Sequence, residues 1–267
     1  VGQLVSLDNY TSGTVDNHID GVTYVEGDTC AIRQIKALDD FAPTHVFHFG
    51  EFSRIVPSFD MPELALKSNL HGTSEVLIYT TRKNAKLVYS GSSAIFGNDM
   101  ADQHLNPYAW SKAKNIELIH NFQNWFGLNF AICYFYNVYG PGQICTGTYA
   151  TVVGIFEEQY KKNQLLTVVS PGTQTRAFTH IDDIVDGIWL VAVGGSGDNY
   201  FLGTTENTSM IELATLFRAP YRFVAERRGE REHSLVCESR ARTELGWTPR
   251  VRLDEYVTKF TNGYSAV

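Results

Sequence analysis

Tyr108 and Lys112 stand four residues apart in a segment, Asn106-Pro-Tyr-Ala-Trp-Ser-Lys112, whose composition predicts the start of a helix. Pro107 suits the first helical position, and Asn106 suits the N-cap before it. Residues four apart lie on one face of a helix. A tyrosine normally has a pKa of about 10, and a lysine ammonium beside it favours the phenolate. The pair is therefore suited to move a proton near neutral pH.

A short apolar segment, Leu87-Val-Tyr89, precedes this helix and has the composition of a buried parallel strand. It ends at Ser90-Gly-Ser-Ser93, where small polar residues are typical of a strand that opens into a site. Pairs with the spacing of Tyr108 and Lys112 also occur by chance on helix surfaces. The serine-rich strand end favours the functional interpretation, in which Ser92 shares the substrate proton with the tyrosine.

These motifs resemble the active-site region of extended short-chain dehydrogenase/reductases, specifically the NAD-dependent epimerase/dehydratase family, whose members act on nucleotide sugars. Ser92 before Ile95-Phe-Gly97 is similar to the family's Ser/Thr before a Val-Tyr-Gly-like triplet, and 107–112 is similar to its Pro-Tyr-x-x-Ser-Lys. The resemblance runs to about residue 255, and its motifs are most similar to those of 4-epimerase-like enzymes. It implies a catalytic set of Ser92, Tyr108 and Lys112.

Strand and helix patterns alternate along the chain, which indicates an α/β protein. Strands are expected at 3–7, 22–25, 44–49, 87–89, 128–135 and 165–169, and helices at 29–41, 62–82, 106–127, 148–161 and 182–193. The resemblance implies a Rossmann-like, doubly wound parallel sheet. We expect an NAD-binding domain at 1–142 and a smaller α/β nucleotide-sugar-binding region at 143–267.

The first Rossmann strand and its Gly-x-x-Gly-x-x-Gly turn are missing from this sequence. The acidic residue that ends the second strand lies about 20 residues beyond such a turn, and Asp8 matches that residue. Two arrangements remain open: either the strand ending at Leu7 pairs with residues 44–49, or the absent segment exists outside this sequence. We expect the second, because Asp8, Asp28 and Asn69 make physical sense around a bound NAD.

The resemblance implies that both ends of NAD are bound. The cofactor-binding residues it gives are Asp8, Asn9, Asp28, Phe49, Gly50, Asn69, Tyr108 and Lys112. A carboxylate at Asp8 binds ribose hydroxyls and repels a 2′-phosphate, which favours NAD over NADP. Asp28 is expected beside the adenine, and Gly50 permits a close approach of the backbone.

Glu51 departs from the family pattern, which has small residues after this strand. A carboxylate at the end of a buried strand needs a partner. Arg54 is the expected partner, unless both side chains are solvated. His45 and His48 on the same strand are expected to be structural, and no metal site is predicted.

Besides Ser92, three residues are expected to bind the nucleotide sugar. Asn137, in Tyr136-Asn-Val-Tyr-Gly-Pro-Gly142, is similar to the family asparagine that bonds the phosphates. Arg176 and Arg227 are similar to the family's diphosphate-binding arginines, with Arg228 as the alternative to Arg227. A guanidinium suits this role because it makes forked, charge-assisted bonds to phosphate oxygens.

The leading function is an NAD-dependent nucleotide-sugar epimerase, a 4-epimerase by preference. Dehydratases of the family carry a carboxylate directly after the catalytic Ser/Thr, whereas Ser93-Ala94 stand here. A reductase and a non-catalytic nucleotide-sugar-binding protein remain open.

Composition limits the partners. Lys and Arg total 22 against 29 Asp and Glu, a net charge of −7, so neither nucleic acid nor an anionic membrane is an expected partner. The four cysteines are far apart, and no signal peptide or membrane span is predicted, which favours a cytoplasmic protein. The resemblance implies a homodimer formed by helices 62–82 and 106–127.

Overall fold

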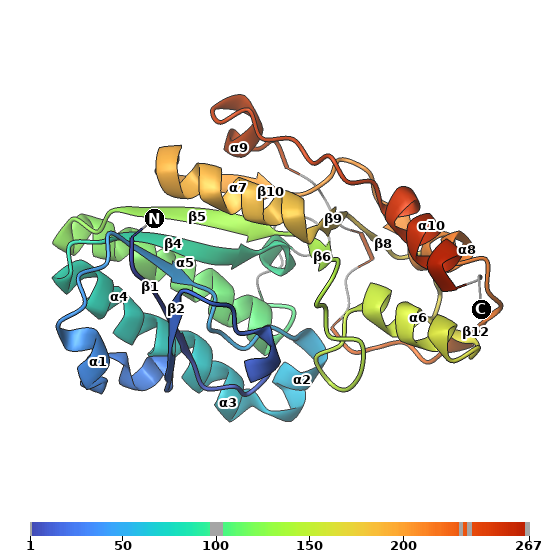
Figure 1. The fold of residues 1–267 in the computed structure, drawn as a ribbon, viewed down its shortest axis with the longest axis horizontal. Coiled ribbons are helices and arrows are strands. Elements are labelled where there is room, and N and C mark those ends of the chain that lie inside the picture. The colour runs from blue at the N-terminus through green and yellow to red at the C-terminus, as the bar shows by residue number, and fades with distance from the viewer. Residues whose placement is uncertain (1, 97–103, 230–231, 234–236, 265–267) are drawn as a thin grey trace.

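A parallel sheet forms the centre of the computed structural model, which describes residues 2–96, 104–229, 232–233 and 237–264 (Figure 1). Its order is β10-β5-β4-β3, and every neighbouring pair is parallel. The strands are β3 (His45–His48), β4 (Lys86–Ser92), β5 (Phe130–Phe135) and β10 (Gly197–Leu202). Two further strands, β1 (Leu4–Asp8) and β2 (Val22–Glu26), form a separate parallel pair.

Helices cover both faces of the central sheet. On one face, α4 (Thr73–Arg82) and α5 (Pro107–Phe126) pack against β4; α7 (Ile181–Gly194) lies on the other face (Figure 1). The β4 side chains alternate accordingly, with Leu87 and Tyr89 in the core beneath α4 and α5, and Val88 in the core beneath α7. The predicted doubly wound α/β fold is therefore confirmed.

A smaller lobe follows the central sheet and is built of short paired strands and three helices. Its strand pairs are β6 (Asn137–Tyr139) with β9 (Phe178–His180), β7 (Leu166–Val169) with β12 (Tyr221–Val224), and β8 (Thr175–Arg176) with β11 (Thr208–Ser209). Its helices are α6 (Val152–Lys161), α8 (Met210–Leu216) and α10 (Leu253–Tyr264). They enclose a core around Phe156 and Phe217. Between these elements the chain returns to the central sheet as α7 and β10.

Two predicted helices have a different form. Residues 29–41 contain a 3₁₀ helix, η2 (Thr29–Gln34), and a single turn, α1 (Lys36–Asp39). Residues 62–82 are helical throughout, but a π-helical turn, η3 (Lys67–Gly72), separates α3 (Pro62–Leu66) from α4. Both departures occur where the two segments contact each other. Additional short helices are η1 (Val15–Asn17), α2 (Ile55–Asp60), η4 (Ser93–Phe96) and α9 (Arg240–Thr243).

The arrangement in which the first strand pairs with residues 44–49 is not found among the described strands. Residues 4–8 pair with 22–26, and residues 45–48 pair with 86–89. β3 is an edge strand among the described strands, and Phe47 on it and Phe49 directly after it are 42% and 44% exposed. β1 and β3 thus belong to separate sheets.

Membrane-spanning helices and metal clusters are absent from the part of the chain that the structure describes. No helix there is both long and apolar enough to cross a bilayer. No group of three His, Cys, Asp or Glu residues there is placed to hold a metal ion. None of the four cysteines forms a disulfide bond within the described residues.

The start of α5 yields a first prediction. The Asn106 side chain accepts a hydrogen bond from Ala109 N at 2.8 Å and is 3% exposed, so it caps the helix that carries Tyr108. We expect Asn106→Ala to lower the free energy of unfolding by about 1 kcal/mol in urea denaturation. Asn106→Ser keeps a capping oxygen and should therefore retain most of the free energy of unfolding that Asn106→Ala loses. Equal stability of Asn106→Ala and the unchanged chain would contradict the role of the cap.

Candidate active site

Ser92, Tyr108 and Lys112 meet at the carboxyl end of β4. Ser92 is the last residue of that strand, which is longer than predicted, and its Oγ accepts a hydrogen bond from Ala94 N at 3.2 Å. Tyr108 and Lys112 occupy the first two turns of α5 and are 8% and 3% exposed. The strand end and the helix start thus place three proton-carrying side chains around one point.

Lys112 is held by groups on β4 and in the loop that follows β3. Its Nζ donates to Ser90 O at 2.5 Å and to the carboxylate of Glu51, and it lies 4.7 Å from the centre of the Tyr89 ring. The Glu51 and Lys112 side chains are 1% and 4% exposed. The expected pairing of Glu51 with Arg54 is therefore wrong. Arg54 instead donates to the backbone oxygens of Ser53 and Tyr149.

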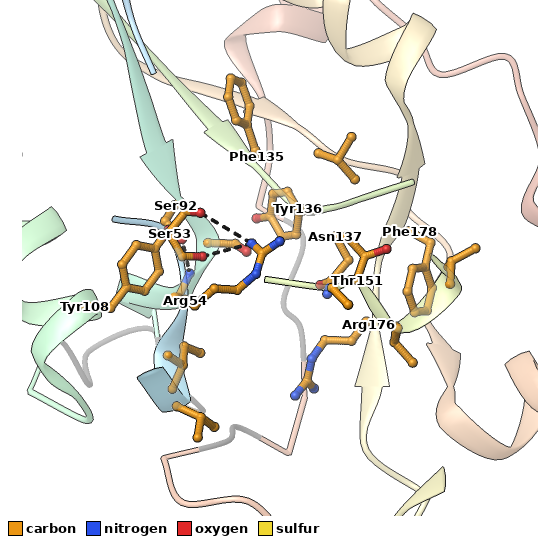
Figure 2. A pocket seen from close by; sticks show the side chains of 18 of the residues that line it. Ser53, Arg54, Ser92, Tyr108, Phe135, Tyr136, Asn137, Thr151, Arg176 and Phe178 are labelled. Carbon is orange, nitrogen blue, oxygen red and sulfur yellow. Dashed lines mark hydrogen bonds between the residues drawn. The ribbon is translucent and has the colours of Figure 1, made fainter. Parts of the chain in front are cut away.

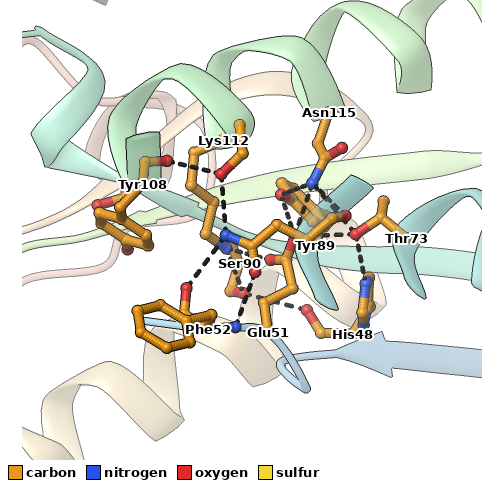
Figure 3. A network of polar contacts seen from close by, with 12 residues as sticks. His48, Glu51, Phe52, Thr73, Tyr89, Ser90, Tyr108, Lys112 and Asn115 are labelled. Carbon is orange, nitrogen blue, oxygen red and sulfur yellow. Dashed lines mark hydrogen bonds and ion pairs between the residues drawn. The ribbon is translucent and has the colours of Figure 1, made fainter. Parts of the chain in front are cut away.

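A shell of neutral donors completes the surroundings of Glu51 (Figure 3). Its carboxylate accepts from Tyr89 Oη at 3.0 Å, Thr73 Oγ1 at 2.8 Å and Asn115 Nδ2 at 2.7 Å. Burial alone would raise the pKa of Glu51, but the Lys112 ammonium, together with the hydrogen bond from Thr73, holds it below its ordinary value. The carboxylate is therefore ionised at neutral pH.

His48 borders this shell without carrying charge. Its Nε2 lies 2.8 Å from Thr73 Oγ1, and the side chain is buried. Burial, reinforced by the nearby Lys112 charge, lowers the pKa of His48 from 6.5 to about 4, although Glu51 opposes the shift. This neutral imidazole fits the predicted structural role.

A cavity of about 940 Å³ opens beside the acid–base set and reaches into the smaller lobe. Figure 2 shows Ser92, Tyr108 and Arg54 on one side of it and Asn137 and Arg176 on the other. Seven of the predicted site residues line it, namely Phe49, Ser92, Tyr108, Lys112, Asn137, Arg176 and Arg227. Residues far apart in the sequence thus surround one space, of a size typical for small-molecule sites.

The structure distinguishes between the two candidate arginines at 227 and 228. Arg227 lines the cavity, whereas the Arg228 guanidinium lies 4.2 Å from the centre of the Phe59 ring. Arg227 is therefore the better placed of the two to reach a ligand. Gly97 and Glu230, which belong to the predicted motifs, lie outside the described residues.

The predicted adenosine-binding residues stand at the carboxyl ends of β1 and β2. Asp8 Oδ1 accepts from Tyr10 N at 2.8 Å, and Asn9 Nδ2 donates to Asp28 at 3.4 Å. Burial opposes ionisation of Asp28, but hydrogen bonds from Cys30 and Asn9 lower its pKa. These residues do not line the 940 Å³ cavity. They form a second polar group at a strand-end edge.

These donor sets fit NAD at both of its ends. Asp8 offers carboxylate oxygens for ribose hydroxyls, and Tyr108 offers a hydroxyl for the other half, whereas the Lys112 ammonium is bonded to Glu51 and Ser90, so its direct contact with the cofactor stays a prediction. A Cβ on Gly50 would lie 3.3 Å from Thr29 Cγ2, which leaves little room for a larger residue. Asn69 is different, because its amide is already bonded to Phe52 N, Phe52 O and Ser111 Oγ. Its direct contact with the cofactor stays a prediction.

Sequence reasoning missed Asn115 and Thr73, which hold Glu51 in place. Asn115 follows Lys112 by three residues and so shares its helix face, which is a signal that the sequence contains. Thr73 follows the π-helical turn that carries Asn69, and π turns are frequent at functional sites. Nothing local in the sequence identifies that turn.

A doubly wound parallel sheet with Ser, Tyr and Lys at a strand end defines the class of short-chain dehydrogenase/reductase folds. Within it, the chain belongs to the NAD dependent epimerase/dehydratase family, whose model matches residues 2–203. The predicted resemblance is thereby confirmed, and NAD is the cofactor of this family.

Three individual relatives are 23–28% identical to this chain in sequence. The chain is 28% identical to a UDP-glucose 4-epimerase of Mycolicibacterium smegmatis, over 96% of this chain and 88% of the relative. It is 27% identical to UDP-glucuronate 4-epimerase 3 of Arabidopsis thaliana, over 91% of this chain and 64% of that enzyme. Its fold matches the UDP-glucose 4-epimerase of Thermotoga maritima, crystallised with UDP-glucose, at a TM-score of 0.91, with 23% identity over 98% of this chain and 90% of that one.

His48 gives a prediction for acid stability. The unfolded chain binds a proton at this residue below about pH 6.5, whereas the folded chain does so only near pH 4. The free energy of unfolding should therefore fall as the pH is lowered from 6.5 to 4, with up to about 3 kcal/mol attributable to His48. In urea denaturation, His48→Gln should flatten this fall, whereas His71→Gln, at an exposed site, should keep it. Equal slopes for both variants would contradict the assignment.

Proposed function

We propose that this protein is an NAD-dependent 4-epimerase of a UDP-sugar. The observation that carries the proposal is that the acid–base set and Asn137, Arg176 and Arg227 line one and the same cavity. One side of this cavity is suited to proton transfer and the other to a diphosphate. The relatives named UDP-glucose and UDP-glucuronate 4-epimerases support the same reaction.

The chemistry assigned to the chain's own residues is proton transfer at the sugar 4-oxygen. Tyr108 accepts the proton of the 4-hydroxyl while Ser92 holds the same oxygen by a hydrogen bond. NAD, when bound, supplies the hydride acceptor and returns the hydride. Tyr108 then gives its proton back to the 4-oxygen of the sugar, now on the opposite face, so the chain ends as it began.

Inversion requires the keto sugar to present both faces while its nucleotide stays bound. Arg176 and Arg227 are placed to hold the diphosphate by charge-assisted hydrogen bonds, with Asn137 as a neutral donor. The cavity of about 940 Å³ leaves room for the sugar ring to turn beside Tyr108. Anchoring one end and freeing the other is what an epimerase needs.

An elimination reaction lacks its usual base in this chain. Ser93 and Ala94 follow Ser92, so the strand end offers no carboxylate to remove a proton beside a ketone. Glu51 also lines the cavity, but its carboxylate is bonded to Lys112 and is 1% exposed. Epimerisation needs no such base, which favours it over dehydration.

Loss of the Tyr108 hydroxyl tests the reaction. With UDP-glucose and NAD, we expect Tyr108→Phe to lower kcat by 10²-fold or more while the circular dichroism spectrum is unchanged, because the variant has no group to carry the proton. Tyr221→Phe, on exposed β12, is the matched control and should keep full activity. A Tyr108→Phe enzyme that still interconverts UDP-glucose and UDP-galactose at the original rate would remove this residue from the mechanism.

We also propose a cytoplasmic homodimer that pairs the surface of α3, η3 and α4 with that of α5. Leu64 on α3 and Trp125 and Phe126 at the end of α5 are large apolar side chains with 39%, 61% and 60% exposure. Their burial in a symmetric interface would stabilise an isologous dimer. The four cysteines, none of which forms a disulfide bond within the described residues, support the predicted location. The net charge of −7 supports the absence of nucleic-acid or membrane partners.

Light scattering checks the assembly. We expect a mass near twice the 29.9 kDa of one chain at micromolar concentration. Trp125→Lys should shift the protein toward the single-chain mass, because it introduces a charge into the proposed interface. An unmodified chain that elutes at 29.9 kDa would refute the dimer.

A further inference from the structure

Glu51 is a buried charged group of the active-site cavity that has no assigned part in the proposed chemistry. It follows β3, lines the active-site cavity, and its carboxylate is bonded to the ammonium of Lys112. Resting on the proposed function, we propose that Glu51 is a positioning residue that fixes Lys112 and limits how strongly this ammonium favours the phenolate of Tyr108.

The first step of the argument is geometric. A lysine carries its ammonium on a flexible four-carbon chain, with three donors to satisfy. Here those donors meet the Glu51 carboxylate, Ser90 O at 2.5 Å and Ser90 Oγ at 3.3 Å. Two of the acceptors belong to β4, so Glu51 supplies the only acidic partner among the described residues. The ammonium is thereby held against Glu51 and Ser90, on a side chain that leaves α5 one helical turn after Tyr108.

The second step concerns charge. A bare ammonium one turn away would stabilise a phenolate, whereas an ammonium paired with a carboxylate presents a dipole with a weaker field. The Lys112 charge and a hydrogen bond from Thr73 lower the pKa of Glu51, so this compensation persists at neutral pH. The pair thus presents a weaker positive field to its surroundings than an unpaired ammonium would.

Other titratable groups around the pair are accounted for. His48 on β3 is neutral at pH 7, because burial lowers its pKa to about 4. Tyr89 on β4 is neutral as well, because burial and the Glu51 charge raise its pKa well above 10. Arg54 is a cation close enough to interact with Tyr108, and its position does not depend on Glu51. Among these groups, a neutral substitution at position 51 therefore removes only the charge of Glu51 itself.

A purely structural role is the competing explanation. Glu51 also joins the end of β3 to α4, α5 and β4 through Thr73, Asn115 and Tyr89, so its loss would destabilise the fold in any case. Thr73→Val is the matched control, because it removes a hydrogen bond from the same carboxylate but keeps the charge pair. A structural role predicts similar behaviour of Glu51→Gln and Thr73→Val.

The test follows the tyrosinate absorbance of Tyr108 with pH, obtained as the difference between each variant and its Tyr108→Phe counterpart. With the carboxylate gone, the positive charge of Lys112 is no longer offset by a paired anion. We therefore expect Glu51→Gln to shift the titration midpoint down by about one pH unit, a tenfold change in proton affinity. Thr73→Val should leave it unchanged. The acid limb of kcat/KM for the UDP-sugar should move with the Glu51→Gln midpoint.

An unchanged midpoint in Glu51→Gln, or an upward one, would overturn the proposal. If Glu51→Gln does not fold, Glu51→Asp, which withdraws the carboxylate by one methylene, should shift the midpoint in the same direction by a smaller amount, and no shift there is equally fatal. The absorbance titration needs neither substrate nor cofactor. It therefore stays decisive if the chain proves to have no epimerase activity, which would overturn only the proposed function.

Discussion

The buried Glu51–Lys112 ion pair is the interaction on which the rest of the site depends. Moving each charge out of water costs several kcal/mol, roughly, and their attraction offsets this only when the geometry is good and the remaining hydrogen-bonding capacity is used. Both conditions are met, since Tyr89, Thr73 and Asn115 donate to the same carboxylate. Through these contacts, one pair of charges ties the end of β3 to β4, α4 and α5. A shift of α5 relative to the sheet would leave a carboxylate buried without its cation.

The fold places this pair where chemistry is useful. Parallel strands end at a common edge, so the Ser-rich end of β4 and the loop after β3 meet without any long connection. Asn106 caps α5 directly above that edge and fixes the position of Tyr108. The smaller lobe then contributes Arg176 and Arg227 from beyond the sheet. The proposed acid–base groups and the proposed phosphate-binding groups therefore come from different parts of the chain and line one cavity.

The sequence was sufficient wherever the signal is local. The strand at 87–89 and the helix at 106–127 were predicted within a few residues, because apolar runs, the Asn-Pro start and the helical spacing act over short distances. The partner of Glu51 was not predicted correctly. Arg54 is three residues away in sequence, but the true partner, Lys112, is 61 residues away and is reached only once β3 and β4 pair. The same holds for the π-helical turn at Lys67–Gly72, which forms against η2.

The residues proposed to bind the diphosphate and those proposed to transfer protons thus lie on different sides of one cavity. A site that held the sugar ring as tightly as the diphosphate would favour one face and one product. Here Arg176 lies across the cavity from Tyr108, Lys112 is fixed by Glu51, and the helix that carries Tyr108 is capped by Asn106 (Figure 2). In the proposed reaction, a ligand anchored only at its diphosphate can present either face of the sugar to Tyr108. The arrangement is therefore matched to a reaction that must run in either direction from the same set of residues.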